Sequence, residues 1–252
     1  MAGGYGTRLS EETTVRPKPM VEIGGQPILW HILKTYSRYG INEFIICAGY
    51  KGHMITEWFA NYRLRTADVT FDFADHSFEF IERAAENWRV SVIQTGDSSM
   101  TGGRLRRVRD YIGDETFCFT YGDGVADIDI SRLIAFHRAE GRQATMTVVQ
   151  PPGRFGAVTL GEGQTGVEHF MEKPLGDGSW INGGYFVLEP GVIDRIEDDS
   201  TVWEQEPLRS LALDGELSAY RHTGFWQPLD TLRDKTMLED LWDSGDPPWK
   251  VW

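Results

Sequence analysis

The sequence predicts an α/β fold with a doubly wound, mostly parallel (Rossmann-like) sheet and a smaller, partly antiparallel lobe. Short β-rich runs alternate with helical patterns through residues 1–150. After Pro151 and Pro152 the pattern changes to short strand-like runs around glycine turns. The chain of 252 residues is long enough for one large domain. We therefore expect a single domain over 1–252, with 1–150 and 151–252 as its two parts.

Helices and strands alternate in the first part. Pro27 and Gly40 mark the two ends of one helix, because apolar residues recur between them with a helical period. This rhythm is typical of a sheet covered on both faces, whose ligands lie beyond the carboxyl ends of the strands. The further expected helices are 53–62, 102–112 and 130–141, and the expected strands are 43–50, 89–95, 116–124 and 144–150.

Strands and helices follow one another less regularly in the second part. Its glycine turns indicate short antiparallel strands within 153–174. A strand with an internal glycine pair follows at 179–190, and 216–222 is a further strand. Helical patterns cover 202–215 and 229–245.

The charge balance limits the possible partners. A formal net charge of −13 argues against a nucleic-acid or anionic membrane surface. An acidic protein that binds phosphates must concentrate its positive charge locally, which directs attention to Arg8, Lys18, Arg104 and Lys173. No apolar run approaches the roughly 18–20 residues of a membrane span, and nothing resembles a signal peptide.

Cysteine and histidine usage favours the cytoplasm and gives no metal site. Cys47 and Cys118 lie in apolar strand-like runs, where a buried free thiol is expected. Two such cysteines do not make a disulfide framework, so we expect a cytoplasmic protein. The six histidines show no metal-ligand spacing and are expected to be surface or packing residues.

A glycine cluster, GGYGTRL, lies near the start of the chain. Gly3, Gly4 and Gly6 would let backbone N–H groups approach an anion, and a following helix start would add partial positive charge. The cluster lacks the GK[ST] of a Walker loop and the G-x-G-x-x-G spacing of a dinucleotide site. By itself it could equally be a plain turn.

Three charged residues have both a functional and an ordinary interpretation. Lys18 lies between Pro17 and Pro19, which stiffen the backbone around it. Considered without the neighbouring motifs, it would be interpreted as a surface lysine. Asp123 follows a strand in YGDG, where a carboxylate can take Mg²⁺. Asp230 alone would be a helix N-cap.

Other residues near these motifs also have two interpretations. Asp127 and Asp129 are expected to cap the helix that begins near Ser131. The Glu172–Lys173 pair alone would be an exposed ion pair. Trp226 could be a wall of a ligand pocket or part of the core.

Together these motifs resemble those of the sugar-1-phosphate nucleotidylyltransferases, essentially from end to end. The resemblance rests on GGYGTRL, RPKPM, the GDG after a strand, EKP and NGG. Longer segments are similar to the glucose-1-phosphate cytidylyltransferases in particular: LSEETTVRPKPMVEIGGQPILWHI, TGDSSMTGGRL, FTYGDGVAD, PPGRFGA, INGG and GFWQPLDTLRDK.

The resemblance implies transfer of a cytidylyl group from CTP to glucose 1-phosphate, giving CDP-glucose and pyrophosphate. The sugar phosphate is already ionised at neutral pH, so it can attack the α-phosphate in line without a general base. Cations, Mg²⁺ and positioned N–H donors would stabilise the charge. The resemblance also implies precursors of deoxysugars for surface polysaccharide, and a homo-oligomer for which a hexamer is one candidate.

The resemblance also assigns residues. Asp123 and Asp230 are the implied metal ligands, and Arg8 and Lys18 the implied catalytic cations, with Arg8 toward the departing phosphates. The implied sugar-phosphate residues are Glu172, Lys173, Asn182 and Gly183. The implied nucleotide-binding residues are Ala2, Gly3, Gly4, Gly6, Thr7, Arg8, Lys18, Ser99, Arg104 and Gly122.

The segment SSMTGGR takes the place where relatives recognise the base. Ser99 and Arg104 match the cytidylyl pattern there, and backbone groups of a glycine-rich loop could pair with a base edge. The ordinary alternative is a helix N-terminus capped by Thr101. In that case the remaining arginines of the helix, Arg106, Arg107 and Arg109, face solvent.

In relatives a short apolar strand directly precedes AGG, whereas here only Met1 and Ala2 do. We expect the first strand to be missing or truncated. Either the natural protein begins a few residues earlier, which we favour, or another segment covers the gap.

Two rival functions remain open. One is a sibling enzyme that uses UTP or dTTP, against which SSMTGGR and the short C-terminus argue. The other is a binding-only regulatory subunit with the same fold. Retention of Lys18, Asp123, Lys173 and Asp230 argues against such a loss of activity.

Overall fold

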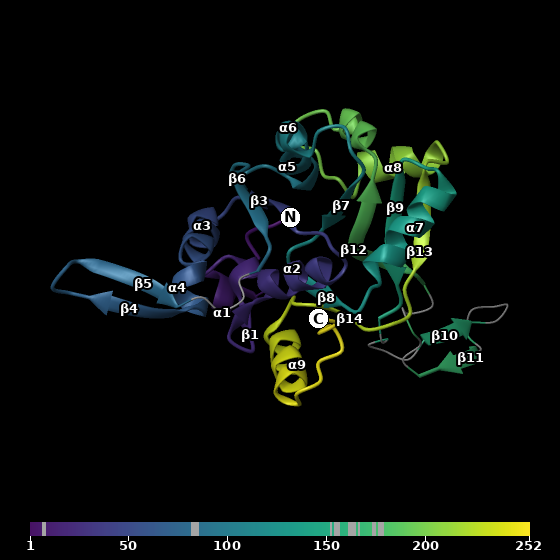
Figure 1. Ribbon diagram of the computed structural model, residues 1–252. Coiled ribbons are helices and arrows are strands. Elements are labelled where there is room, and N and C mark those ends of the chain that lie inside the picture. Colours follow the sequence, from purple (N-terminus) through teal and green to yellow (C-terminus); the bar gives the residue numbers. More distant parts are fainter. Residues whose placement is uncertain are drawn as a thin grey trace.

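Strands from both parts of the chain meet at the centre of the molecule, with helices around them and two hairpins that project at opposite ends (Figure 1). The structure is a computed structural model. It describes residues 1–6, 9–81, 86–151, 153, 157–160, 165, 167–172, 175 and 179–252.

The larger central sheet joins the two parts of the chain in the order β13–β9–β12–β7. β13 runs parallel to β9, whereas β12 is antiparallel to both of its neighbours. The predicted α/β class is therefore confirmed, with a mixed sheet in place of a mostly parallel one. These four strands are β7 (Phe117–Thr120), β9 (Ala144–Val149), β12 (Ile181–Leu188) and β13 (Leu217–Arg221).

Met1 and Ala2 lie between this sheet and a second, parallel pair of strands. Ala2 forms an isolated parallel bridge with Ala48, at the end of β3. The Met1 ammonium group donates to the carbonyl oxygen of Thr120 on β7, at 2.8 Å. These two residues thus take the place expected for the first strand, with a single bridge instead of a ladder. The parallel pair consists of β3 (Glu43–Ala48) and β6 (Arg89–Gln94).

Helices pack around the strands where the sequence predicts them. The helix expected after Pro27 begins at Ile28, so the proline precedes its first turn. Buried residues recur along it with a helical period, which fixes the face that meets the sheet. The helical elements are α1 (Ser10–Thr13), η2 (Lys18–Met20), α2 (Ile28–Arg38), α3 (Gly52–Ala60), α4 (Tyr62–Thr66), α5 (Thr101–Arg107), α6 (Arg109–Ile112), α7 (Ile130–Glu140), η4 (Pro190–Arg195), α8 (Glu206–Leu213) and α9 (Leu232–Asp243).

Within the described residues, four further antiparallel strand pairs complete the fold. The β10–β11 pair confirms the antiparallel strands expected after Pro152. The β4–β5 hairpin projects from the other end of the molecule (Figure 1) and was not expected from the sequence. The pairs are β1 (Glu22–Ile23) with β2 (Gln26–Pro27), β4 (Asp68–Asp72) with β5 (Ser77–Ile81), β8 (Gly124–Ala126) with β14 (Trp226–Pro228), and β10 (Ala157–Leu160) with β11 (Val167–Met171).

The core has two clusters of buried side chains, one around α2 and one that includes Phe186 and Trp203. Both cysteines are free. Burial raises the pKa of both thiols, that of Cys118 to about 12. Among the residues that the structure describes, no helix is both long and apolar enough to cross a bilayer.

His31 on α2 is fully buried and surrounded by tryptophans. The indole N–H of Trp249 can only donate, and it points at His31 Nδ1 at 3.3 Å. Nε2 therefore carries the proton and donates to the carbonyl oxygen of Ile23 at 2.9 Å. Burial disfavours the charged ring and lowers the pKa of His31 from 6.5 to about 4.

We expect this buried imidazole to make the protein less stable in acid. The unfolded chain takes up a proton on His31 near pH 6.5 and the folded chain only near pH 4, so stability falls as the pH is lowered between these values. The full loss is about 3 kcal/mol. In His31→Gln, whose amide can keep both hydrogen bonds, urea unfolding should show a weaker pH dependence over this window. His53→Gln, at an exposed histidine of α3, is the control. Parallel curves for wild type and His31→Gln would contradict the expectation.

Candidate active site

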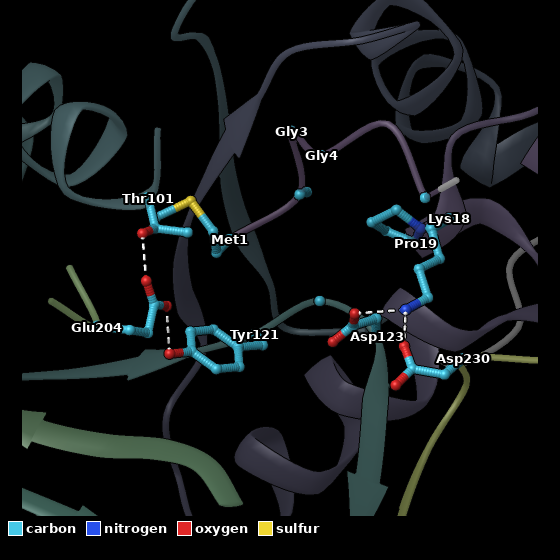
Figure 2. Close-up of a pocket in the computed structure, with 13 residues that line it drawn as sticks. Met1, Gly3, Gly4, Lys18, Pro19, Thr101, Tyr121, Asp123, Glu204 and Asp230 are labelled. Atoms are coloured by element: carbon cyan, nitrogen blue, oxygen red, sulfur yellow. Dashed lines mark hydrogen bonds and ion pairs between the residues drawn. The ribbon is translucent and has the colours of Figure 1, made fainter. Parts of the chain in front are cut away.

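A pocket of about 340 Å³ opens where the first residues of the chain meet the ends of β7 and β8 (Figure 2). Glycine-loop backbone forms one side, and ionisable side chains face each other across the opening. Its lining residues are Met1, Ala2, Gly3, Gly4, Gly6, Lys18, Pro19, Thr101, Tyr121, Gly122, Asp123, Glu204 and Asp230. Of the predicted nucleotide and metal residues that the structure describes, all are among them except Ser99 and Arg104.

Glycine is required at different positions of the loop for different structural reasons. A Cβ on Gly3 would lie 2.2 Å from Arg104 Nη1, so only glycine lets the loop pack on this side chain. Gly6 has a φ of +62°, which favours glycine. Gly4 is exposed, and a Cβ there would meet no atom of the described residues within 4 Å, so its backbone offers room for a ligand. The predicted role in phosphate binding therefore suits Gly4 best.

Lys18 is the basic side chain that reaches into the pocket among the residues that the structure describes. It begins the short helix η2 between two prolines and is 9% exposed. Its Nζ donates to Asp123 Oδ2 at 2.7 Å and to Asp230 Oδ1 at 2.6 Å. Burial lowers the pKa of Lys18, but its two carboxylate partners outweigh this and raise the pKa above 10.5. The ammonium group is thus held charged in a fixed position, as a phosphate-binding cation requires.

Two loops bring the carboxylates to Lys18. Asp123 lies between β7 and β8, and its carbonyl oxygen accepts from Leu229 N at 2.7 Å, which ties the two loops together. Asp230 does not cap α9: Thr231 is the N-cap, in a capping box with Asp234. Because Thr231 satisfies the helix, the carboxylate of Asp230 is available to Lys18.

The donor set fits a magnesium ion. Asp123 and Asp230 converge on one point, each with an oxygen within 2.7 Å of Lys18 Nζ. Mg²⁺ prefers oxygen ligands and commonly uses one or two carboxylates together with waters and substrate phosphates. No group of three or more potential metal ligands occurs among the described residues, so this pair would hold the ion together with its substrate.

Arg104 and Ser99, expected to contact the base, lie behind the pocket. Arg104 is 3% exposed, and its two terminal nitrogens donate to five oxygen atoms. One acceptor is the carbonyl oxygen of Gly3, at 2.9 Å. Ser99 is also buried and donates to the carbonyl oxygen of Thr95 at 2.6 Å. In this structure Arg104 therefore supports the glycine loop and does not line the pocket.

The glycines of SSMTGGR are inside a helix and serve packing. Gly102 and Gly103 lie in α5, and both N–H groups point to the carbonyl oxygen of Thr201. A Cβ on Gly102 would lie 2.7 Å from that oxygen, and one on Gly103 only 2.4 Å from the carbonyl oxygen of Asp199. These two N–H groups are therefore used within the protein and are not free to pair with a base. The helix alternative is correct, although Met100 and not Thr101 is the N-cap.

Opposite Lys18, the pocket has a wall that the sequence analysis missed (Figure 2). Thr101 Oγ1 donates to Glu204 Oε2 at 2.6 Å, and the hydroxyl of Tyr121 donates to Glu204 Oε1. Burial, and then the negative charge of Glu204, raises the pKa of Tyr121. These residues come from three distant segments: Thr101 and Tyr121 lie in family-like motifs, but Glu204 does not.

The described residues that we expected to bind the sugar phosphate, Glu172, Asn182 and Gly183, do not line this pocket. Asn182 is adjacent to it, because its Nδ2 donates to the hydroxyl of Tyr121 at 3.1 Å. Gly183 is buried against β9, and a Cβ there would lie 3.0 Å from Val149. Glycine at this position therefore allows the sheet to pack closely. Trp226 donates to the carbonyl oxygen of Gly183 at 2.7 Å and lines a second pocket of about 280 Å³.

Four predicted site residues remain: Glu172, Thr7, Arg8 and Lys173. Glu172 is exposed at the end of β11. Thr7, Arg8 and Lys173 lie outside the described residues, so their expected roles stay predictions.

An α/β sheet with a glycine loop, a buried lysine and two acidic residues at one edge defines a nucleotide-binding enzyme site. The family model described as nucleotidyl transferase matches residues 1–226. The chain belongs to this family and is a nucleotidyltransferase, one of the enzymes that transfer nucleotidyl groups to sugar 1-phosphates and generally use a divalent metal ion.

Two curated relatives are similar to this chain over its full length. The chain is 62% identical to the glucose-1-phosphate cytidylyltransferase of Salmonella typhimurium (strain LT2), over all of this chain and 98% of that protein. It is 44% identical, with the same coverage, to a probable glucose-1-phosphate cytidylyltransferase of Bacillus subtilis (strain 168).

Solved structures agree on the fold. HddC from Yersinia pseudotuberculosis superposes with a TM-score of 0.69 at 22% identity, covering 96% of each chain. An apo UDP-glucose pyrophosphorylase gives a TM-score of 0.69 at 15% identity, covering 97% of this chain and 96% of that chain.

Proposed function

We propose that this enzyme transfers a cytidylyl group from CTP to glucose 1-phosphate, releasing pyrophosphate and forming CDP-glucose. The observation that carries the proposal is the pocket in which Lys18 contacts Asp123 and Asp230 beside the glycine loop. The proposed substrates are those in the name of the Salmonella relative, which is 62% identical over the full chain.

The pocket suits a displacement that needs positioning more than acid–base chemistry. The attacking oxygen of a sugar phosphate is already ionised at neutral pH, so a general base is not needed. Among the described residues that line the pocket there is no histidine or cysteine. What the chain must supply is positive charge and N–H donors around the α-phosphate during in-line attack.

Lys18 and the glycine loop supply these groups. The Lys18 ammonium is fixed by two carboxylates and a proline-flanked backbone, so little rotamer freedom is left to lose when a phosphate binds. The exposed backbone at Gly4 offers an approach for phosphate oxygens. Arg8 follows in the sequence motif GGYGTRL, and we assign it to the departing phosphates.

Asp123 and Asp230 would hold Mg²⁺. When bound, the ion offsets the negative charge that gathers on the phosphate oxygens. The same two carboxylates orient Lys18, so the residues that would hold the metal also position the catalytic cation.

The sugar phosphate is assigned to the side of the pocket that Asn182 reaches through Tyr121. We assign Glu172 to the sugar hydroxyls, Lys173 to its phosphate, and the backbone near Gly183 to the ring. Free thiols and a nucleotide substrate favour the cytoplasm.

We also propose that the enzyme is a homo-oligomer, for which a hexamer is one candidate. The projecting β4–β5 hairpin supports this, because it exposes Phe71 (55%), Phe73 (85%) and Phe78 (56%). Large exposed aromatic groups of this kind are typical of interfaces. Sedimentation velocity would measure the assembly, and a monomer at micromolar concentration would contradict it.

The reaction is tested by offering glucose 1-phosphate and Mg²⁺ with each of CTP, UTP, dTTP, ATP and GTP. We expect pyrophosphate release to be clearly fastest with CTP, and CDP-glucose to appear in equal amount. Faster turnover of UTP or dTTP than of CTP would refute the cytidylyl assignment while leaving the family intact. No turnover of any nucleotide would favour a binding-only protein.

A further inference from the structure

Glu204 is a carboxylate at the wall of a pocket that binds polyanions in the proposed reaction. It is exposed into the opening and lies across it from Lys18 (Figure 2). A carboxylate repels phosphate oxygens. Glu204 must therefore face a part of the substrates that carries hydrogen-bond donors and little negative charge.

Two hydroxyl groups fix the orientation of this carboxylate. Trp203 N donates to Thr101 Oγ1 at 2.9 Å, so the single hydroxyl proton of Thr101 is left for Glu204. In the same way, Asn182 Nδ2 donates to the Tyr121 oxygen, and the Tyr121 proton goes to Glu204. Each carboxylate oxygen thus accepts one internal hydrogen bond and keeps a further lone-pair direction for a ligand.

The backbone around Glu204 is held as firmly as its side chain. The segment before it packs on α5, where the Gly102 and Gly103 N–H groups donate to the carbonyl oxygen of Thr201 at 3.0 and 3.2 Å. Trp203, the preceding residue, is fully buried. Glu204 is thus a preorganised acceptor, which a solvated surface glutamate would not be.

The position of Glu204 between its two partners indicates which donors it meets. Tyr121 directly precedes Gly122 and Asp123, on the metal and phosphate side of the pocket. Thr101 begins α5 and belongs to SSMTGGR, the segment that the family resemblance places at the base. The part of a nucleotide that lies between its phosphates and its base is the ribose, whose vicinal hydroxyls are donors well suited to a carboxylate.

We propose that Glu204 accepts hydrogen bonds from the ribose hydroxyls of the nucleotide, the 2′-hydroxyl among them, and so selects ribonucleotides over deoxyribonucleotides. This inference rests on the proposed function, because it takes CTP as the substrate. A site built to bind a hydroxyl group discriminates against the analogue that lacks it, since its acceptor is then left unpaired.

The test compares CTP with dCTP by kcat/KM for pyrophosphate release with glucose 1-phosphate. Wild type should prefer CTP by about 10–100-fold, the range for one hydrogen bond to a charged group. In Glu204→Gln this preference should fall by about tenfold. Tyr121→Phe, which removes one of the two orienting hydroxyls, should give an intermediate preference. Glu206→Gln is the matched control, because Glu206 loses the same charge two residues away but pairs with Arg209 outside the pocket.

The other outcomes separate the alternatives. If Glu204→Gln changes the CTP:UTP ratio of kcat/KM and leaves the CTP:dCTP ratio unchanged, the carboxylate contacts the base and the proposal is wrong. If all nucleotides lose activity equally, the role is structural and the proposal is also wrong. Equal use of CTP and dCTP by wild type overturns this inference alone, whereas wild type that does not use CTP at all overturns the proposed function.

Discussion

Replacement of Lys18 by alanine is expected to lower kcat about 10²–10³-fold, the scale for removing one donor that stabilises a transition state. Lys18 is the one basic side chain among the described residues that line the pocket. Its loss also leaves Asp123 and Asp230 facing each other without the ammonium group that now joins them. The measurement is steady-state pyrophosphate release at saturating CTP, glucose 1-phosphate and Mg²⁺.

The control for this prediction is Lys34→Ala. Lys34 also forms an ion pair, with Glu86 at 2.9 Å, but it is not among the residues that line the pocket. We expect its kcat to stay within about twofold of wild type. Circular dichroism and the melting temperature should show that both variants are folded. A Lys18→Ala enzyme with a near-normal kcat would remove this residue from the mechanism.

The regular elements of the fold could be predicted because their signals are local. The helix that starts at Ile28 and the strand β3 follow from the spacing of apolar residues, and Asp129 caps α7 as expected. Asp127 does not cap this helix and lies 3.0 Å from His222 instead. The direction of β12 could not be predicted, because it depends on pairing with strands far away in the chain.

The β4–β5 hairpin was missed although the sequence carries a signal for it. Val69 and Phe71 alternate with polar residues, as Phe78 and Phe80 do in the second strand. His76, in the turn, has a φ of +52°, a conformation that few non-glycine residues adopt. The alternating pattern alone would have predicted two strands here.

The site could be predicted only where a motif carries it. Lys18, Asp123 and Asp230 are far apart in sequence, and the predicted metal and phosphate roles are now supported by contacts of 2.6–2.7 Å. Tyr121 lies in FTYGDGVAD but Glu204 lies in no such motif, so only the fold shows that they meet in the pocket. Sequence resemblance finds residues that a family shares, but it does not show which side chains face one another.

Arg104 supports the glycine loop from behind the pocket, and this position leads to the second prediction. We expect Arg104→Lys to lower the free energy of unfolding and to raise the KM for CTP, with little change in the CTP:UTP ratio. Arg104 contacts five oxygen atoms, and a lysine ammonium has three donors. At least two buried contacts would be lost, at about 1–3 kcal/mol each, against a typical total stability of about 5–15 kcal/mol. Urea unfolding and steady-state kinetics with both nucleotides would measure these effects.

Arg106→Lys is the matched control, because Arg106 is exposed on the same helix. Its stability should stay within about 0.5 kcal/mol of wild type. If Arg104→Lys instead kept its stability and lost its preference for CTP, Arg104 would contact the base, as the SSMTGGR motif suggested.

Gly49→Ala tests whether Arg104 supports the glycine loop, without a change to Arg104 itself. Gly49 is buried and its Cβ would lie 2.2 Å from Arg104 Nη1, so the guanidinium group would have to move although Arg104 itself is unchanged. Since the guanidinium group lies against both Gly49 and Gly3, its displacement should weaken the hydrogen bond to the Gly3 carbonyl oxygen and loosen the glycine loop. We therefore expect Gly49→Ala to raise the KM for CTP in the same direction as Arg104→Lys. An unchanged KM in Gly49→Ala, with Arg104→Lys impaired, would mean that Arg104 acts on the nucleotide by a route other than the loop.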